Sequence, residues 1–274
     1  MLKKEERYFV YRHAYVPEHL PGYVAAVSGA NPHLHENYLC FTRKNHLIFI
    51  GYPLENRSDD LARCYDAACE RFRPATAAII APIIWLPPQT FEKHQKDCYY
   101  RLDLPLGRPN PAVAYMVRRA EKELCVTLGN FSKEHRRLVD DFLSSHQLTK
   151  AQRHIFRHIQ HYLKASKYAR LIEARKKTTL VAFTIADMGS TEFAFYLFNF
   201  RSTREKIPGA SDLLFNEMVS LAQSEGKKAI NLGLGIHPGI RRFKEKWGGV
   251  PFLSYASALV HREPPDLGGL ANKL

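Results

Sequence analysis

Residues 229–249 read AINLGLGIHPGIRRFKEKWGG. The first six residues form a short, mostly apolar run that ends at Gly235, which predicts a buried strand rather than a helix. A helix is expected next, because Pro238 suits a first helical turn, where its missing N–H has no intrahelical acceptor. The two glycines at 248 and 249 supply a stop. The stretch therefore predicts a buried strand followed directly by a short helix.

The helix after Pro238 has an apolar side. On a helical wheel Ile240, Phe243 and Trp247 fall within about 60° of one another, and Lys244 lies about 40° from Ile240. Lys244 is therefore expected to border the buried face, at the rim of a cleft, where a cation can meet an anionic ligand in partly dry surroundings. The alternative is a lysine whose stem packs on the helix while its ammonium group reaches water.

The strand, the Gly-x-Gly turn and the motif R-F-K-x-K-W-G-G resemble the end of the acyltransferase domain in Fem-type peptidoglycan bridge-forming ligases. Those ligases belong to the superfamily of Gcn5-related N-acetyltransferases, and the resemblance covers roughly residues 168–259. It implies that Lys244, with Phe243 beside it, is catalytic: the lysine assists reaction at the carbonyl of an acyl donor and binds phosphate. It also implies two acetyltransferase-like domains in tandem.

The order of elements after residue 123 fits that superfamily. The expected elements are a strand at 124–128, helices at 132–145 and 149–165, strands at 168–174, 179–187 and 192–200, a helix at 211–225, and the strand, helix and final strand that follow. Three consecutive strands rich in β-branched and aromatic residues suggest an antiparallel meander.

The first 122 residues show a fainter version of the same order. The expected elements are strands at 39–42 and 47–52, a helix to residue 72 capped by Asp59 or Asp60, strands at 75–85 and 99–104, and a helix at 111–122. We therefore predict an α/β (α+β) chain of two tandem domains, at 1–122 and 123–274. Each has a mixed, mostly antiparallel sheet flanked by helices.

Composition and charge bound the function. The 274 residues are 45% hydrophobic and 24% charged, as in an ordinary globular protein, and the net charge of +13 implies anionic partners. Five cysteines without a C-x-x-C spacing indicate neither a disulfide framework nor a zinc site, so we expect a cytoplasmic protein. No apolar run is long enough for a membrane segment, and we expect a monomer.

The loop at residues 204–211, REKIPGAS, precedes the helix of the second domain. Acetyltransferases carry a Q/R-x-x-G-x-G/A loop here, whose backbone N–H groups bind the diphosphate of coenzyme A at a helix N-terminus. The similar but imperfect match assigns cofactor binding to Arg204, Lys206, Gly209, Ala210 and Ser211. Asp212 counts against it, because its charge would repel a diphosphate, and a Pro-Gly turn with a serine cap explains the same residues.

Other residues are candidates for substrate binding. Arg118 and Arg119 resemble a basic helix between the domains of Fem-type enzymes, although a solvated charged face explains them too. Tyr196, Asn199 and Asn231 lie on strands that can face the cleft; the first two have opposite parity, so at most one should do so on a regular strand. The remaining basic candidate is Arg241.

A metal site is not expected. His154, His158 and His161 fall within about 60° on one helix, which is typical of imidazole ligands. However, arginines flank them and no carboxylate shares their face, so a polar helix surface is the default interpretation.

The sequence therefore predicts an acyltransferase that moves an acyl or aminoacyl group to an amine. The donor is an acyl-coenzyme A or an aminoacyl-tRNA, used as a co-substrate rather than held permanently. The acceptor is not identified. The competing hypothesis is a non-catalytic module that binds tRNA by shape and keeps the acyltransferase fold.

Overall fold

The computed structural model describes residues 2–55, 60–108 and 110–262. Within them, eleven strands form one continuous sheet in the order β1-β2-β3-β4-β11-β5-β10-β9-β8-β7-β6. The strands are β1 (Asn31–His35), β2 (Tyr38–Arg43), β3 (His46–Ile50), β4 (Thr76–Ala81), β5 (Phe91–Asp103), β6 (Cys125–Leu128), β7 (Ala169–Lys176), β8 (Thr179–Asp187), β9 (Phe193–Arg201), β10 (Ala229–Leu234) and β11 (Val250–His261).

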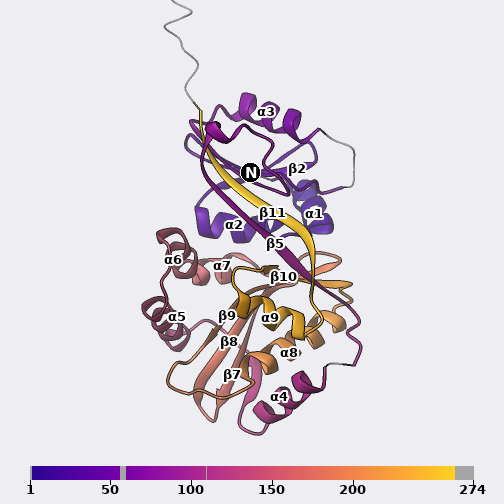
Figure 1. Ribbon diagram of the computed structural model, residues 1–274, viewed down its shortest axis with the longest axis vertical. Helices are drawn as coiled ribbons and strands as arrows, with labels where there is room; N and C mark the ends of the chain where they lie inside the picture. The colour runs from indigo at the N-terminus through magenta and orange to yellow at the C-terminus, as the bar shows by residue number, and fades with distance from the viewer. Residues whose placement is uncertain (1, 56–59, 109, 263–274) are drawn as a thin grey trace, which may run out of the picture.

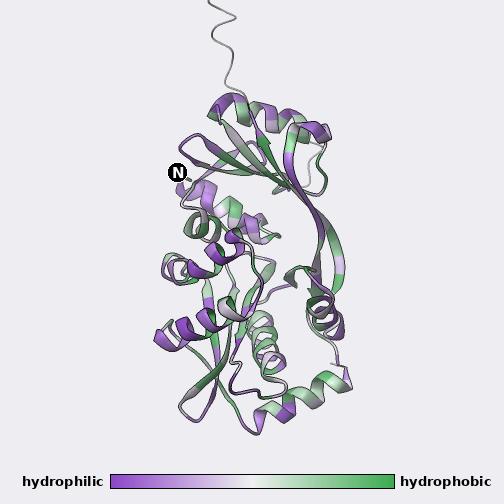
Figure 2. Ribbon diagram, turned by 60° about the vertical axis from the view of Figure 1, so that its left-hand side comes forward, coloured by the Kyte–Doolittle hydropathy of each residue, from purple (hydrophilic) through white to green (hydrophobic). Residues whose placement is uncertain are grey.

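Helices cover this sheet on both sides. They are α1 (Lys4–His13), α2 (Pro21–Ser28), α3 (Leu61–Phe72), α4 (Pro111–Glu121), α5 (Lys133–Ser145), α6 (Lys150–Arg157), α7 (Ile159–Ala165), α8 (Ala210–Ser224) and α9 (Pro238–Lys246), with single 3-10 turns at Pro17–His19 and Pro88–Thr90. Coloured by hydropathy, green concentrates along the strands and purple on the outer turns of the helices, as expected of a sheet buried between helices (Figure 2).

The two halves of the sheet repeat one motif. In the first half β2 and β3 are antiparallel and β3 and β4 are parallel, with α3 as the crossover. In the second half β8 and β9 are antiparallel and β9 and β10 are parallel, with α8 as the crossover. The fold class is confirmed: the chain has two tandem α+β units with a mixed, mostly antiparallel sheet.

The halves exchange their last strands. Strand β5 leaves the first half and pairs with β10, while β11 returns from the second half and pairs with both β4 and β5. Figure 1 shows these two long strands running side by side from one half of the molecule to the other. Helix α4 belongs to the expected first domain, residues 1–122. It packs on α8, which belongs to the expected second domain, residues 123–274. The division into 1–122 and 123–274 stays a proposal about where the repeated units begin.

Two separate cores flank the sheet of the second half. Helices α4, α8 and α9 enclose one core, which includes Val117, Phe215 and Trp247. On the opposite face α5, α6 and α7 enclose another, which includes Leu138 and Tyr162. Helix α2 of the first half packs on α7. The end of β9 thus lies between two groups of helices, and a site at that end can receive residues from both.

Several elements differ from expectation. Asp60 caps α3 by accepting the backbone N–H groups of Ala62 and Arg63; Asp59 lies outside the described residues. The helix expected at 149–165 is broken at His158, which has the non-helical angles φ −95° and ψ 2°. Helices α1 and α2 and strand β1 were not expected. No helix among the described residues is long and apolar enough to cross a membrane.

Candidate functional site

Strands β9 and β10 diverge partway along their length. Their parallel pairing covers residues 229–231 against 193–195 and ends there. Leu234, farther along β10, pairs instead with Tyr99 of β5. Residues 196–201 of β9 therefore keep β8 as their described neighbour and lack a partner strand on the other side. This divergence leads from the centre of the sheet toward the N-terminus of α8.

A pocket lies where β9 ends. Its volume is about 390 Å³, and its wall combines the end of β9, the loop before α8 and the last turns of α5. The lining residues are Phe142, His146, Val181, Asn199, Arg201, Ser202, Thr203, Glu205, Lys206, Ile207, Pro208 and Ala210. The pocket therefore lies at the loop in which the sequence predicts a diphosphate site.

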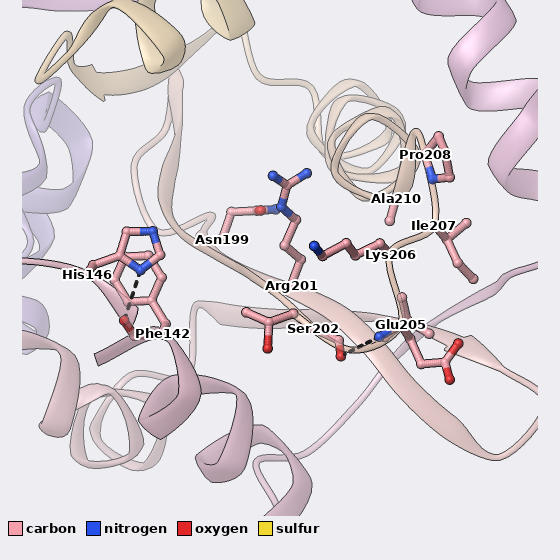
Figure 3. Close-up of a pocket in the computed structure, with 12 residues that line it drawn as sticks. Phe142, His146, Asn199, Arg201, Ser202, Glu205, Lys206, Ile207, Pro208 and Ala210 are labelled. Carbon is pink, nitrogen blue, oxygen red and sulfur yellow. Dashed lines mark hydrogen bonds between the residues drawn. The ribbon is translucent and has the colours of Figure 1, made fainter. Parts of the chain in front are cut away.

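The pocket is electropositive. Figure 3 shows the side chains of Arg201 and Lys206 reaching over it beside Asn199, with the carboxylate of Glu205 turned away. No carboxylate of the described residues lies within ion-pair distance of either cation. Gly209 is the N-cap of α8 and has no side chain, so the first backbone N–H groups of the helix are not satisfied by a capping side chain. Two cations and a helix N-terminus together favour an anionic ligand.

Asn199 contributes an unsatisfied hydrogen-bond donor to the pocket. The Ser211 hydroxyl donates to its Oδ1 at 3.0 Å, which holds the amide against the first turn of α8. Its Nδ2 is buried and has no hydrogen-bond partner. A buried amide N–H without an acceptor is unfavourable, so an acceptor atom on a ligand would stabilise this arrangement.

Gly209 has a structural reason to be glycine. Its φ is +85°, and a Cβ at this position would lie 2.2 Å from the backbone oxygen of Met116 in α4. A side chain here would push α4 away from α8 whether or not a ligand binds. A substitution at Gly209 consequently reports on helix packing and is a poor test of ligand binding.

The expected conflict between Asp212 and a bound diphosphate was wrong. The Asp212 carboxylate is buried and turned toward α9, where Trp247 Nε1 donates to it at 2.9 Å. Lys246 lies 2.6 Å from the same oxygen. The charge is therefore neutralised by α9 and does not face the pocket. The sequence could not show this, because the direction of the Asp212 side chain depends on contacts with α9, which lies far along the chain.

Lys244 was expected at a cleft rim, and this too was wrong. Its side chain is buried, with 3% of the residue exposed, and Nζ donates to the backbone oxygen of Leu234 at 2.5 Å. Burial lowers the pKa of its ammonium group to about 7, and Asp97 opposes part of that shift. Nζ also lies 5.5 Å from the ring centroid of Tyr100. Asp97 and Tyr100 both belong to β5, so this strand covers the face of α9 that bears Lys244.

Lys244 nevertheless lies beside the divergence of β9 and β10. A Cβ at Gly233, where β10 turns away, would be 3.9 Å from Lys244 Nζ and 3.7 Å from the backbone oxygen of Tyr196 in β9. Gly233 itself has a positive φ of 74°, which the turn requires. The lysine thus lies at the inner end of the divergence, and the electropositive pocket lies at its outer end.

Tyr196 and Asn199 lie on the same side of β9, contrary to the parity argument. Pairing with β8 skips Leu197, since Ile185 pairs with Phe198 and the next residue pairs with Tyr196. This bulge reverses the alternation. Tyr196 consequently packs on Phe243 of α9, with centroids 6.2 Å apart, and Asn199 faces Ser211 of α8.

Phe243 has a packing position within the site. Its ring meets Phe215 of α8 at a centroid distance of 5.7 Å, and Lys246 Nζ lies 4.9 Å over its face. The ring therefore fixes α9 against α8 and β9. A catalytic contribution of Phe243 stays a prediction, and its described contacts are those of a residue that positions Lys244.

The other expected residues are placed differently. Asn231 is fully buried, where its amide donates to the oxygen of Tyr15 and accepts from Gly233, so it joins two segments of the protein. The structure does not bring the exposed side chains of Arg118, Arg119, Arg204 and Arg241 into the pocket lining. Their contact with a bound donor stays a prediction.

Sequence reasoning missed Arg201, Phe142 and His146. Arg201 lies just outside the strand expected at 192–200, although in the structure it ends β9. Its position directly before the loop expected to bind a diphosphate was the available signal. Phe142 and His146 come from α5 on the opposite face of the sheet. Their ring centroids lie 4.1 Å apart in a stacked pair, and no local pattern connects them with α8.

The three-histidine face forms no metal site among the described residues. His154 and His158 have ring centroids 4.0 Å apart, and a ring nitrogen of His154 lies 2.8 Å from the backbone oxygen of Val27 in α2. The helix break at His158 separates the third histidine, His161, from the first. The default interpretation, a polar helix surface, stays a prediction.

Solved structures with the same arrangement exist. The chain superposes on FemX with a TM-score of 0.63 at 11% identity, covering 93% of this chain and 96% of that one. The Fem-like tandem acetyltransferase fold is confirmed. L-PGS from Bacillus licheniformis matches with a TM-score of 0.59 at 16% identity, covering 98% and 94%. A tandem GNAT protein from the clavulanic acid biosynthesis pathway matches with a TM-score of 0.53 at 12% identity, covering 84% and 79%.

These likenesses establish the fold of the chain, and at such low identities they carry no information on its function. No protein-family model matches the chain, and no curated protein matches its sequence. The fold places the diverging strands, the electropositive pocket and Lys244 along one path, so any functional assignment depends on the chemistry of those residues.

Proposed function

We propose that the protein is an acyltransferase that moves an acyl or aminoacyl group from a phosphate-bearing donor to an amine. The donor is an acyl-coenzyme A or an aminoacyl-tRNA. The observation that carries this proposal is the pocket at the uncapped start of α8, where Arg201 and Lys206 have no carboxylate partner among the described residues. The diverging strands connect that pocket with Lys244.

The proposed reaction needs positioning and charge stabilisation rather than a covalent enzyme intermediate. The nitrogen of the acceptor amine attacks the donor carbonyl carbon, a C–N bond forms, and the C–S or C–O bond to the donor breaks. The proton released by the amine ends on the leaving thiol or hydroxyl. Holding both reactants in line lowers the barrier, as does a cation beside the developing oxyanion.

Lys244 is the proposed cation for the carbonyl. Water is largely excluded around its ammonium group, so its charge acts more strongly on a nearby oxygen than that of an exposed lysine. Its pKa near 7 also permits proton exchange near neutral pH. We assign phosphate binding to Arg201 and Lys206 instead, because these two residues line the pocket at the start of α8 and Lys244 does not.

The acceptor amine is proposed to approach from a second cavity. This cavity, of about 590 Å³, lies between β5, β11 and the segment after β4, and Asp97 is part of its wall. The Asp97 carboxylate raises the pKa of Lys244 electrostatically, so the two are close enough to interact. A carboxylate at this point attracts a cationic amine toward the reaction centre, where the ammonium group must release one proton to solvent before its nitrogen can attack the carbonyl carbon.

Ligand-induced stabilisation tests the donor pocket. We would measure the melting temperature with coenzyme A and with uncharged tRNA, each in about hundredfold excess over its dissociation constant. A ligand that binds only the folded state should then add about 2.7 kcal/mol to the free energy of unfolding. The variant Arg201→Gln/Lys206→Gln should lose most of this gain, because both cations that face the phosphate are removed.

The matched control is Lys4→Gln/Arg7→Gln, which removes two exposed charges from α1 outside the pocket. It should keep the ligand-induced gain. Equal losses in both variants would contradict a localised pocket and favour diffuse charge attraction. Stabilisation by tRNA without any transfer to amines from its aminoacylated form would favour the alternative function, a non-catalytic tRNA-binding module.

A further inference from the structure

One segment of the second half carries positive charge without negative charge. Residues 142–172 contain no aspartate or glutamate. The basic residues of this segment are Lys150, Arg153, Arg157, Lys164, Lys167 and Arg170, with histidines at 146, 154, 158 and 161. The preceding helix α5 carries Asp140 and Asp141 among its cations, so the charge imbalance begins where α5 ends.

Five of these side chains are exposed on α6 and α7. Lys150, His154 and Arg157 share one face of α6, and His161 and Lys164 share one face of α7, which follows after the break at His158. We call this set the α6–α7 stripe. Its α6 part, from Lys150 to Arg157, is roughly 10 Å long at 1.5 Å per residue, and its α7 part follows after the break at His158.

The cations of the α6–α7 stripe are available for a partner. Within residues 2–55, 60–108 and 110–262, no carboxylate lies within ion-pair distance of Lys150, Arg157 or Lys164. The rings of His154 and His161 both lie near the ring of His158, with centroid distances of 4.0 Å and 5.2 Å. Such rings can stack on bases, whereas exposed lysines and arginines contact phosphates.

The stripe begins at the mouth of the electropositive pocket. The guanidinium of Arg153 in α6 donates to the backbone oxygen of Leu143 at 2.8 Å and to that of His146 at 3.4 Å. His146 is itself part of the pocket wall. These hydrogen bonds fix the start of α6 beside the pocket, so a chain that lies along the stripe can continue into it.

We propose that the α6–α7 stripe binds the phosphate backbone of an RNA whose 3′ end enters the pocket. This rests on the proposed transfer function and selects a tRNA-type donor for it. An acidic membrane is the competing partner for a basic helix face, but a membrane-binding helix also exposes large apolar side chains. Among the described residues those are Tyr8, Ile83, Tyr115, Leu128, Ile236 and Val250, and none lies on α6 or α7.

Salt-dependent RNA binding tests the proposal. We would titrate fluorescently labelled, uncharged bulk tRNA and follow its anisotropy at several salt concentrations. Lys150→Gln/Arg157→Gln/Lys164→Gln should weaken binding at least tenfold and reduce the log–log salt slope by roughly two to three, about 0.7 to 0.9 for each lost phosphate contact. The control Lys4→Gln/Arg7→Gln/Arg12→Gln removes the same charge from exposed positions of α1 and should change affinity less than twofold.

Three further outcomes separate the possibilities. Equal loss in the two triple variants overturns the proposal, as does stripe-dependent binding to vesicles of equal parts phosphatidylglycerol and phosphatidylcholine with no tRNA binding. If tRNA fails to bind while coenzyme A stabilises the protein through Arg201 and Lys206, the stripe proposal fails and the transfer function stands. Unchanged coenzyme A stabilisation and an unchanged melting temperature in the stripe variant would show that it is folded.

Discussion

Lys244 and the pair of Arg201 and Lys206 carry the same formal charge in opposite surroundings. Lys244 is buried, its Nζ is held by a backbone oxygen, and burial lowers its pKa to about 7. Arg201 and Lys206 are exposed and extend over an open pocket. One cation is therefore suited to act on a single atom at close range, and the other two to hold a solvated anion.

The resemblance to Fem-type ligases assigned two roles to Lys244, phosphate binding and assistance at the donor carbonyl. The different surroundings of the cations separate these two roles. Phosphate binding needs cations that can lose a little water and still pair with several oxygens, as surface side chains do. Acting on a developing oxyanion needs a fixed charge in dry surroundings. The structure provides these two environments at opposite ends of the diverging strands β9 and β10.

The largest expected effect is that of Lys244→Met. Methionine keeps the aliphatic volume but removes the charge, so kcat should fall about 10²- to 10³-fold, as for loss of a single oxyanion-stabilising group. The free energy of unfolding should change by only about 1 kcal/mol, because one hydrogen bond is lost while a desolvated amine is removed. Single-turnover kinetics and denaturant unfolding would measure both quantities.

Lys246→Met is the matched control for that experiment. Lys246 lies two residues along the same helix and pairs with Asp212, so its loss removes a charge from α9 without touching the diverging strands. Its kcat should stay within about threefold of the unaltered protein. If the two variants lose activity equally, Lys244 has no special role.

The pKa of Lys244 predicts an intermediate effect on stability. An unfolded lysine has a pKa near 10.5 and the folded one about 7, so the unfolded state binds more protons between these pH values. The free energy of unfolding contributed by Lys244 should therefore rise with pH through this window, by up to about 1.4 kcal/mol per pH unit. Denaturant unfolding at pH 7, 8 and 9 should show this rise, and Lys244→Met should lack it; parallel curves would contradict it.

The smallest effect is expected for Asp212→Asn. Because the carboxylate faces Trp247 and Lys246 rather than the pocket, donor affinity should change less than twofold. The free energy of unfolding should fall by about 1 kcal/mol, since asparagine keeps an acceptor for the indole but loses the charge. A tenfold gain in donor affinity would instead place the carboxylate against the bound phosphate.

Elements with strong local signals were predicted closely. The strands at 179–187 and 229–234 coincide with β8 and β10, and Ser132 and Thr149, the first residues of two expected helices, cap α5 and α6. Caps and buried apolar runs depend on a few neighbouring residues, which a sequence displays directly. The first part of β5 was missed because it has no such local signal. Residues 92–96 are exposed and read EKHQK, with no alternation of apolar and polar residues.

The site was less predictable because it depends on tertiary contacts. The loop before α8 was located from its sequence, and the pocket lies there. The burial of Lys244 comes from β5, the direction of Asp212 from α9, and the reversed parity after Tyr196 from a bulge against β8. Each of these contacts joins residues far apart in the chain, where periodicity gives no information.

The returning strand β11 has a consequence for the order of synthesis. It lies between β4 and β5, and its pairs with β4 join Thr76 to His261. A ribosome must therefore complete nearly the whole described chain before the first half receives the strand that joins its β4 to β5. Until then both strands present unpaired edges, which other chains can bind. We expect the two halves to become stable together, late in translation, rather than one after the other.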